Sequence, residues 1–366
     1  MGLIVEILHY VIALYREQYS DYGPTLFAEK LEEHHGNLLS LIPNHETIRR
    51  WLLTSGDWAT ERVRRVHRRK RERRDAIGSL LQFDGSDHDW FERRGPRCCL
   101  LVAIDDASGR ILMRFAPSEN TRDVLLTLRA YIAQYGIPHE LYTDLGSVYH
   151  TKDGKYLTDV GRALARLGVK MITAHSPQAK GRVERSNRTH QDRLVKALRH
   201  EDISTIEAAN RFLERVYLND HNKRFALTEG LKDSHRPAAG LDLDNIFCFE
   251  TTRRVYNDYT ITLGASFIQL ERSKKVSLPP PGQTVTVRHY LNDDSLHIFW
   301  NEQELDYSSV KERPKPQAPV VRPPSPNHPW RLLKQIGKGR YRDKRTITKS
   351  RSNSGKKTLS STPRNT

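Results

Sequence analysis

The pattern of apolar and polar positions changes character twice along the 366 residues of the chain. Near the N-terminus apolar residues recur every three or four positions, which is the spacing of one face of a helix. This spacing predicts a helix over 3–19, a second from Pro24 to Gly36, and a third that begins near Pro43 and runs through Leu52. We therefore expect an all-α region of three short helices at the start of the chain.

The third predicted helix is rich in arginine, and three short helices of this kind are typical of a helix-turn-helix unit that binds DNA. A plain three-helix bundle is the alternative. In the helix-turn-helix interpretation, the residues that point outward toward DNA are His45, Thr47, Arg49 and Arg50.

Between residues 80 and 217 short apolar strands alternate with amphipathic helices. The predicted strands are 80–84, 98–105, 110–116, 140–143 and 169–174, and the predicted helices are 121–135, 157–167, 183–198 and 206–217. The first three strands follow one another directly and should form an antiparallel meander. Strands and helices then alternate, so we expect a mixed α/β sheet with this meander at one edge.

Period-two alternation replaces the helical pattern after residue 251. The five predicted strands are 254–256, 260–263, 267–270, 285–290 and 296–300, and together they predict a small five-stranded β-barrel. From Glu312 onward, 8 of the 18 prolines of the chain fall in a stretch without apolar periodicity, which predicts a disordered tail.

The charge of the chain is concentrated in two short segments. Residues 61–75 hold nine Lys or Arg and three Asp or Glu, and residues 312–366 hold 15 Lys or Arg and two Asp or Glu, whereas the whole chain carries +16. The remainder is therefore close to neutral. Such segments are either solvated linkers and tails or phosphate-binding arms. Because two of them flank a neutral core, we expect a nucleic acid as partner.

Composition excludes several classes of protein. The apolar run from Leu3 to Tyr15 contains Glu6 and His9, is too short to span a bilayer, and lacks the features of a signal peptide. The three cysteines are too few for a disulfide framework or for a zinc site of the CxxC type. We therefore expect neither a membrane nor a secreted protein, but a cytoplasmic one.

Three carboxylates are candidates for chemistry. Asp84 and Asp144 end two strands that should lie side by side and parallel, so their carboxylates should meet at one edge of the sheet, and Gly85 and Gly146 would allow close approach there. Glu184 begins a helix that can pack on this sheet. Carboxylates brought together in this way repel, and Mg²⁺ or Mn²⁺ relieves the repulsion. Two such ions suit phosphoryl transfer.

Other acids compete with this interpretation. Asp105 and Asp106 end an antiparallel strand, so they should lie at the opposite edge of the sheet and form a turn. Asp87 and Asp89 should lie in the loop after the first strand, where they could cap the loop or help to position a metal. The alternative for all three candidates is a set of unrelated surface acids.

Three stretches carry a resemblance to a known family: QFDGSDHDW at 82–90, YTDLGSVY at 142–149, and SPQAKGRVERSNRT at 176–189. They resemble the DDE core of bacterial insertion-sequence transposases that have a retroviral-integrase-like catalytic core. The resemblance covers about 20–310 and is strongest over 80–225. It implies a ribonuclease-H-like fold in which Asp84, Asp144 and Glu184 are catalytic and hold two Mg²⁺ or Mn²⁺ ions.

The resemblance also implies partners and a place in the cell. The partners would be DNA, both as element ends and as target duplex, with the protein acting as a homo-oligomer at the bacterial nucleoid. On the helix of Glu184, the residues expected to meet DNA are Arg182, Arg188 and Gln191, joined by Lys180 in the preceding loop. A solvated helix face is the alternative for the arginines.

The chain departs from retroviral integrases in two ways. The adjacent His34 and His35 have no cysteine pair nearby, so we predict no structural zinc. The spacing from Asp144 to Glu184 is a few residues longer than is typical, with the extra length expected in 149–156.

These patterns divide the chain into six parts. They are a helix-turn-helix domain (1–60), a basic linker (61–78), a ribonuclease-H-like core (79–225), a connector (226–250), a small β-barrel (251–311) and a disordered basic tail (312–366). The predicted function is a DNA transposase. A plain ribonuclease-H-like nuclease and a non-catalytic helix-turn-helix regulator are the alternatives, and the terminal repeat and the target sequence stay open.

Overall fold

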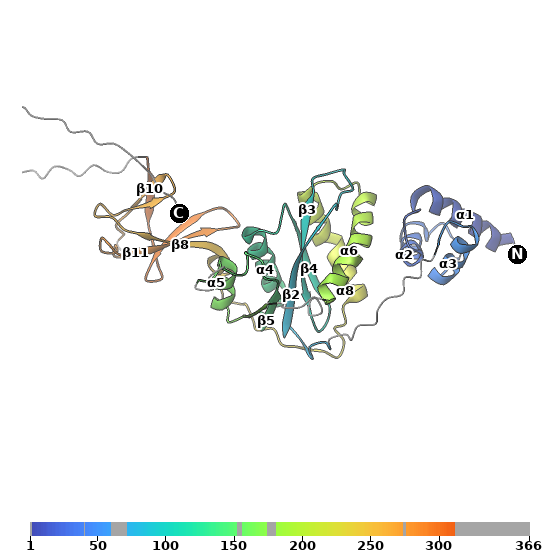
Figure 1. Cartoon of the computed structure of the whole chain (residues 1–366), viewed down its shortest axis with the longest axis horizontal. Coiled ribbons are helices and arrows are strands. Elements are labelled where there is room, and N and C mark those ends of the chain that lie inside the picture. The colour runs from blue at the N-terminus through green and yellow to red at the C-terminus, as the bar shows by residue number, and fades with distance from the viewer. Residues whose placement is uncertain are drawn as a thin grey trace, which may run out of the picture. The chain divides into compact units, whose positions relative to one another are not determined.

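The computed structural model describes residues 2–39, 41–59, 72–151, 156–173, 181–273 and 276–311 (Figure 1). Most of the predicted basic linker and all of the predicted tail lie outside these ranges. In the described part of the chain, no helix has both the length and the apolar character needed to cross a membrane.

Three helices form the N-terminal region, with bounds close to those predicted. They are α1 (Gly2–Gln18), α2 (Pro24–His35) and α3 (His45–Thr54). Pro24 occupies the first turn of α2, and the Asn44 side chain caps α3 by accepting a hydrogen bond from the Thr47 N–H at 2.8 Å. Val11, Phe27 and Ile48 are fully buried between the helices.

The central sheet has five strands in the order β4-β3-β2-β5-β6. Their bounds are β2 (Leu80–His88), β3 (Cys98–Asp105), β4 (Ile111–Ala116), β5 (Glu140–Thr143) and β6 (Lys170–Thr173). β2, β3 and β4 pair antiparallel, whereas β2, β5 and β6 pair parallel, so the predicted mixed sheet with its meander is confirmed. The predicted end of the first strand at residue 84 is wrong, because β3 pairs with β2 as far as His88.

Helices cover both faces of this sheet (Figure 1). One face packs against α4 (Thr121–Tyr135) and α5 (Asp159–Arg166), and the other packs against α6 (Gly181–His200) and α7 (Ile206–Phe212). The predicted helix over 206–217 proves to be longer: after α7 comes one π-helical turn, Leu213–Tyr217, and then α8 (Leu218–Phe225).

Two short elements are described in the segment between α8 and the C-terminal strands. β7 (Lys232–Asp233) pairs in parallel with β1 (Ala76–Ile77), and α9 (Leu243–Ile246) follows. This segment therefore lies alongside the residues that immediately precede β2.

Among the described residues of the C-terminal region there are seven strands, whereas the sequence pattern predicts five. They are β8 (Cys248–Arg254), β9 (Thr260–Leu263), β10 (Ser266–Leu270), β11 (Thr284–Tyr290), β12 (Leu296–Trp300), β13 (Gln303–Leu305) and β14 (Tyr307–Val310). They form two sheets, β14-β10-β9 and β13-β12-β11-β8, and no closed barrel among the described residues. The predicted barrel is thus not confirmed, because the predicted strands themselves divide between two sheets.

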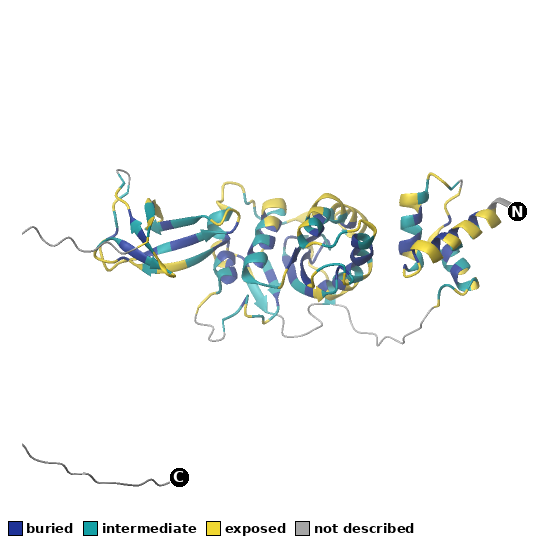
Figure 2. Cartoon of the chain, turned by 90° about the horizontal axis from the view of Figure 1, so that it is seen from above, coloured by how far each residue is buried: buried dark blue, intermediate teal, exposed yellow. Residues whose placement is uncertain are grey.

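Buried side chains of both sheets share one apolar cluster that includes Val255, Ile261, Val285 and Ile298. Figure 2 shows buried segments in this region, in the N-terminal helices and in the central sheet. The C-terminal region is therefore a small two-sheet unit with a core of its own.

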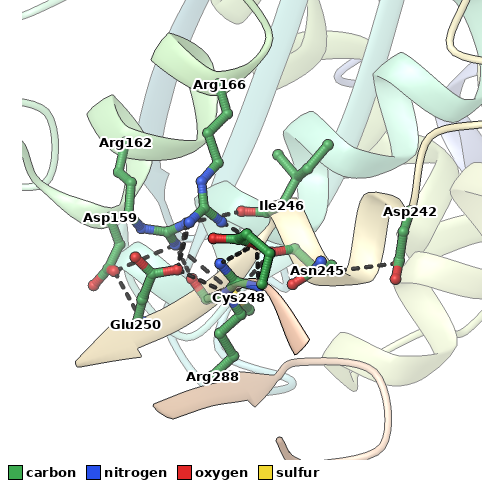
Figure 3. A network of polar contacts seen from close by, with 10 residues as sticks. Asp159, Arg162, Arg166, Asp242, Asn245, Ile246, Cys248, Glu250 and Arg288 are labelled. Carbon is green, nitrogen blue, oxygen red and sulfur yellow. Dashed lines mark hydrogen bonds and ion pairs between the residues drawn. The ribbon is translucent and has the colours of Figure 1, made fainter. Parts of the chain in front are cut away.

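A network of charged side chains joins this region to α5 (Figure 3). The Glu250 carboxylate of β8 lies 2.7 Å from Arg166, 2.9 Å from Arg288 and 3.7 Å from Arg162. Burial by itself raises the pKa of Glu250, but the three guanidinium groups outweigh burial and hold the pKa below its usual value. We call these four residues the junction cluster.

Apolar contacts reinforce the junction cluster. Phe247 and Leu291 are buried in the same cluster as the apolar side chains of α4 and α5. The core of the α/β region therefore continues into residues that the sequence assigns to the connector and the barrel.

Candidate active site

Asp84 and Asp144 are neighbours because of the parallel pairing of β2 with β5. The register aligns Leu80 with Glu140 and Gln82 with Tyr142. Asp84 lies two residues after Gln82, and Asp144 lies two residues after Tyr142, so this register brings Asp84 beside Asp144. Asp84 lies within β2, not at its end as predicted, whereas Asp144 directly follows β5 as predicted.

The side chains of β2 alternate between the two faces of the sheet. Leu81 and Phe83 are buried on the face that packs against α4 and α5. Gln82, Asp84 and Ser86 point to the other face, where α6 lies, and we call these three residues the polar row. Partners from α6 meet two members of the row. Asn187 Nδ2 donates to Asp84 Oδ2 at 3.0 Å, and Gln191 Nε2 donates to Ser86 Oγ at 3.2 Å.

Glu184 lies in the first turn of α6 and is exposed. Residues three apart on a helix are surface neighbours, so Glu184 lies one turn from Asn187 on the side of α6 that faces Asp84. Within the described ranges, however, no three Asp, Glu, His or Cys side chains lie close enough together to form a metal site. The structure thus places Asp84 beside Asp144 and leaves Glu184 on the adjoining helix.

The glycines beside the two aspartates make room for carboxylates. A Cβ atom at Gly85 would lie 2.5 Å from Glu119 Oε2, and a Cβ atom at Gly146 would lie 2.8 Å from Asp144 Oδ1. The Gly146 N–H also donates to Asp144 Oδ1 at 2.8 Å. A side chain at either position would therefore make the neighbouring carboxylate move.

A tyrosine holds the Glu119 carboxylate, which lies next to Gly85. Tyr149 donates its phenol hydrogen to Glu119 Oε1 at 2.6 Å and is itself buried. Burial raises the pKa of Tyr149 strongly, and the charges of Glu119, Asp144 and Asp84 raise it further. The phenol therefore stays protonated and remains a donor to Glu119 at neutral pH.

The donor atoms around Asp84 suit a hard divalent cation. In the described part of the chain, the amide oxygens of Gln82 and Asn187 are buried and have no hydrogen-bond partner. Carboxylate and amide oxygens, such as those of Asp84, Asp144 and the contacting Asn187, are the donors that Mg²⁺ and Mn²⁺ prefer. The residues present therefore fit the expected metal.

Two of the competing acids have structural roles. Asp105 accepts hydrogen bonds from the Ser108 and Gly78 N–H groups, both at 2.7 Å, which confirms it as a turn former. Asp89 accepts from the Arg93 N–H at 3.1 Å and so caps the turn after β2. Asp87 belongs to β2, so its expected place in a loop is wrong.

Asp106 does more than form a turn, which corrects the expectation from sequence. Its carboxylate is fully buried and reaches two other elements. Gln82 Nε2 of β2 donates to Asp106 Oδ1 at 2.7 Å, and Arg182 Nε of α6 lies 2.7 Å from the same oxygen.

The predicted DNA contacts fall in different surroundings. His45, Thr47, Arg49 and Arg50 all lie on α3, where His45 and Arg50 are exposed and Arg49 forms a two-pronged ion pair with Glu46 at 2.7 and 2.8 Å. On α6, Arg188 is exposed, Gln191 contacts Ser86, and Arg182 is ion-paired with Asp106. Lys180 lies outside the described residues.

Sequence reasoning missed Asn187, Glu119 and Tyr149. Asn187 follows Glu184 by three residues, so helical spacing alone would have identified it as a neighbour of the site. Glu119 and Tyr149 come from separate loops, and no local pattern links them.

Two curated proteins are similar in sequence to this chain, and both are named as transposases. The chain is 40% identical to the transposase y4bF of Sinorhizobium fredii over 307 residues, which is 81% of this chain and 66% of that protein. It is 31% identical to the transposase for insertion sequence IS1202 of Streptococcus pneumoniae over 74% of this chain and 62% of that protein. These findings confirm the resemblance, although the chain spans just under two thirds of each relative. No family profile matches the chain.

Solved structures with a related arrangement are retroviral integrases. The catalytic core of BIV integrase aligns with 42% of this chain and 90% of its own, at 25% identity and a TM-score of 0.31. A chain of the simian T-cell lymphotropic virus intasome, solved with the PP2A subunit B56 gamma, covers 74% of this chain and 95% of its own at 16% identity and a TM-score of 0.36.

Proposed function

We propose that this protein is a DNA transposase, a polynucleotidyl transferase that cleaves DNA at the ends of a mobile element and joins them to a target duplex. One observation carries the proposal: β2 and β5 bring Asp84 beside Asp144, and α6 contacts Asp84 through Asn187 while presenting Glu184 one turn away. The similarity to two transposases supports it.

Asp84, Asp144 and Glu184 would hold two Mg²⁺ or Mn²⁺ ions in this proposal. When bound, divalent ions would supply charge stabilisation for the attacking and leaving oxygens of an in-line displacement at phosphorus. The protein's own contribution is to orient the ligands. The Asn187 amide fixes Asp84, and the Gly146 N–H fixes Asp144. A structural zinc ion has no role in the proposal.

DNA recognition would be divided between regions. Residues 1–60 would read the element ends through His45, Thr47, Arg49 and Arg50, and Lys180, Arg188 and Gln191 would contact DNA next to the site. The basic segments 61–75 and 312–366 would bind phosphates without reading sequence, which makes their contribution sensitive to salt. We further propose that the protein acts as a homo-oligomer on DNA, because joining needs two element ends and a target.

A strand-transfer assay tests the proposal. Duplexes taken from the sequences that flank the gene are incubated with the full chain, Mg²⁺ and a plasmid target, and the products are mapped by sequencing. The proposal expects 3′-end cleavage at one fixed position followed by joining. Cleavage without joining would indicate a nuclease, and specific binding without cleavage would indicate a regulator. The Asp144→Asn variant serves as the control for contaminating nucleases.

A further inference from the structure

One buried carboxylate outside the proposed ligands connects three segments of the chain. Asp106 Oδ1 accepts from Gln82 Nε2 at 2.7 Å and lies 2.7 Å from Arg182 Nε, while Asp106 Oδ2 accepts from the Arg74 N–H at 2.9 Å. The Asp106 side chain is 0% exposed and that of Arg182 is 19% exposed. A charge this deeply buried is retained only with such partners.

Two of the connected segments carry proposed metal ligands. Gln82 precedes Asp84 by two residues, so both side chains belong to the polar row of β2. Arg182 precedes Glu184 by two residues in the first turn of α6. Asp106 therefore connects β2, which carries Asp84, directly with the first turn of α6, which carries Glu184.

The third connected segment is the end of the basic linker. The Arg74 backbone donates to Asp106, and the Arg74 side chain donates to Glu140 at the start of β5 at 2.7 Å. The chain that enters the α/β region is thus held at the same buried carboxylate. All three connections fix segments that lead into the site.

We propose that Asp106 and Arg182 are positioning residues for the metal site. Their ion pair fixes the first turn of α6 against β2, and so sets where the Glu184 carboxylate stands relative to Asp84. This inference rests on the proposed function, because it takes Glu184 to be a ligand. It also assigns Arg182 to the protein interior and not to DNA, since its guanidinium is turned toward a buried acid.

Removing either partner leaves the other charge buried without its counterpart, so the first turn of α6 shifts or frays. Loss of a group that orients a metal ligand usually weakens metal binding or activity by about 10- to 100-fold. Duplex binding without metal does not depend on where Glu184 stands, so it should not change.

The test measures Mn²⁺ binding to the full chain by the electron paramagnetic resonance signal of free Mn²⁺. The Asp106→Asn and Arg182→Gln variants should each bind Mn²⁺ about 10- to 100-fold more weakly than the wild type. The double variant should bind Mn²⁺ no more weakly than the single variant with the lower affinity, because the two residues act as one unit. Arg182→Lys keeps the charge but not the guanidinium geometry, so it should be intermediate. Duplex affinity in EDTA, from fluorescence anisotropy, should match the wild type throughout.

Asp105→Asn is the matched control. Asp105 is as deeply buried as Asp106 and adjacent in sequence, but its carboxylate accepts hydrogen bonds from Gly78 and Ser108 in the turn. This variant should lose thermal stability comparable to that lost by Asp106→Asn and keep wild-type Mn²⁺ binding. An equal loss of Mn²⁺ binding in the control would show that general destabilisation, not positioning, is responsible.

The outcomes separate the inference from the function on which it rests. Wild-type Mn²⁺ affinity in Arg182→Gln overturns the inference, and if the same variant also loses duplex affinity in EDTA, Arg182 contacts DNA. Should Asp106→Asn fail to fold, the two Arg182 variants decide the question alone. If the wild type binds no Mn²⁺, or if Asp84→Asn binds it unchanged, the proposed function is wrong and the inference falls with it.

Discussion

The two faces of the central sheet differ in chemistry although both are buried. On the face toward α4 and α5, β2 presents Leu81 and Phe83, and β3 presents Leu101 and Ala103. On the face toward α6, β3 is again apolar, with Leu100 and Val102, but β2 presents the polar row. Along β2 one face is thus polar, whereas the neighbouring strand β3 is apolar on both faces as far as Ile104.

The difference indicates that one face of the sheet serves stability and the other serves chemistry. Apolar side chains would fill the α6 face of β2 at no cost in desolvation, whereas each buried polar group loses free energy unless it is hydrogen-bonded. The chain keeps the polar row and supplies partners for it from α6 and Asp106. We therefore expect substitutions close to Asp84 on the α6 face to affect chemistry and substitutions on the other face to affect stability.

The largest expected effect comes from the three acids. Asp84→Asn, Asp144→Asn and Glu184→Gln should each reduce cleavage and joining by at least about 1,000-fold, equivalent to about 4 kcal/mol of transition-state stabilisation. Each change removes a ligand charge but little volume, so melting temperature and duplex binding should stay near wild type. Single-turnover cleavage measures the effect. A variant that cleaves at a near-wild-type rate identifies an acid that is not a ligand.

A substitution on the apolar face should act on stability instead. Leu101 is fully buried against α4, and Leu101→Ala should lower the free energy of unfolding by about 2–5 kcal/mol. Urea unfolding measures this loss. Single-turnover cleavage at a temperature where the variant is folded should match the wild type, and a large drop in that rate would contradict the division between the faces.

Asn187 tests how far the polar row depends on α6. Asn187→Ala removes the amide that donates to Asp84, so cleavage should fall by about 10- to 100-fold while duplex affinity is retained. Thr189→Ala on the same helix is the control, because its hydroxyl bonds only to the Arg185 carbonyl within the described structure. Equal cleavage rates for Asn187→Ala and Thr189→Ala would show that Asn187 is not part of the site.

The smallest expected effect lies at the far end of the polar row. Ser86→Ala removes the hydroxyl that accepts from Gln191 at 3.2 Å, so it should cost about 0.5–1.5 kcal/mol of stability. Urea unfolding measures this cost, and cleavage should be almost unchanged. A loss of cleavage as large as that of Asn187→Ala would extend the site as far as Ser86.

Much of the sheet follows from local signals in the sequence. The apolar run Cys98–Asp105 gives β3 directly, and α4 begins after the Asn120 cap and ends before Gly136, as the pattern predicts. The parallel pairing of β2, which carries Asp84, with β5, which leads into Asp144, also follows from the predicted topology. These features depend on local spacing and on simple topology.

The failures occur where pairing between distant segments overrides the local pattern. Gly85 and the polar residues after it look like a turn, but β3 extends β2 through them. The short strands β13 and β14 lack apolar alternation, so their pairing with β12 and β10 could not be foreseen. The contact of Asp106 with Arg182 joins residues far apart in sequence, which no periodicity encodes.

The burial of Phe247 and Leu291 limits where the chain can be cut. An expression fragment that stopped after α8, at Phe225, would omit both side chains, which are 1% and 3% exposed in the full chain, and would open the apolar interior to water. It would also lack Glu250, which is the ion-pair partner of Arg162 and Arg166. Aggregation of such a fragment would then reflect a badly chosen boundary and not an unstable catalytic region. A minimal fragment should therefore extend at least through β14, so that both C-terminal sheets stay paired and the buried Leu305 is kept.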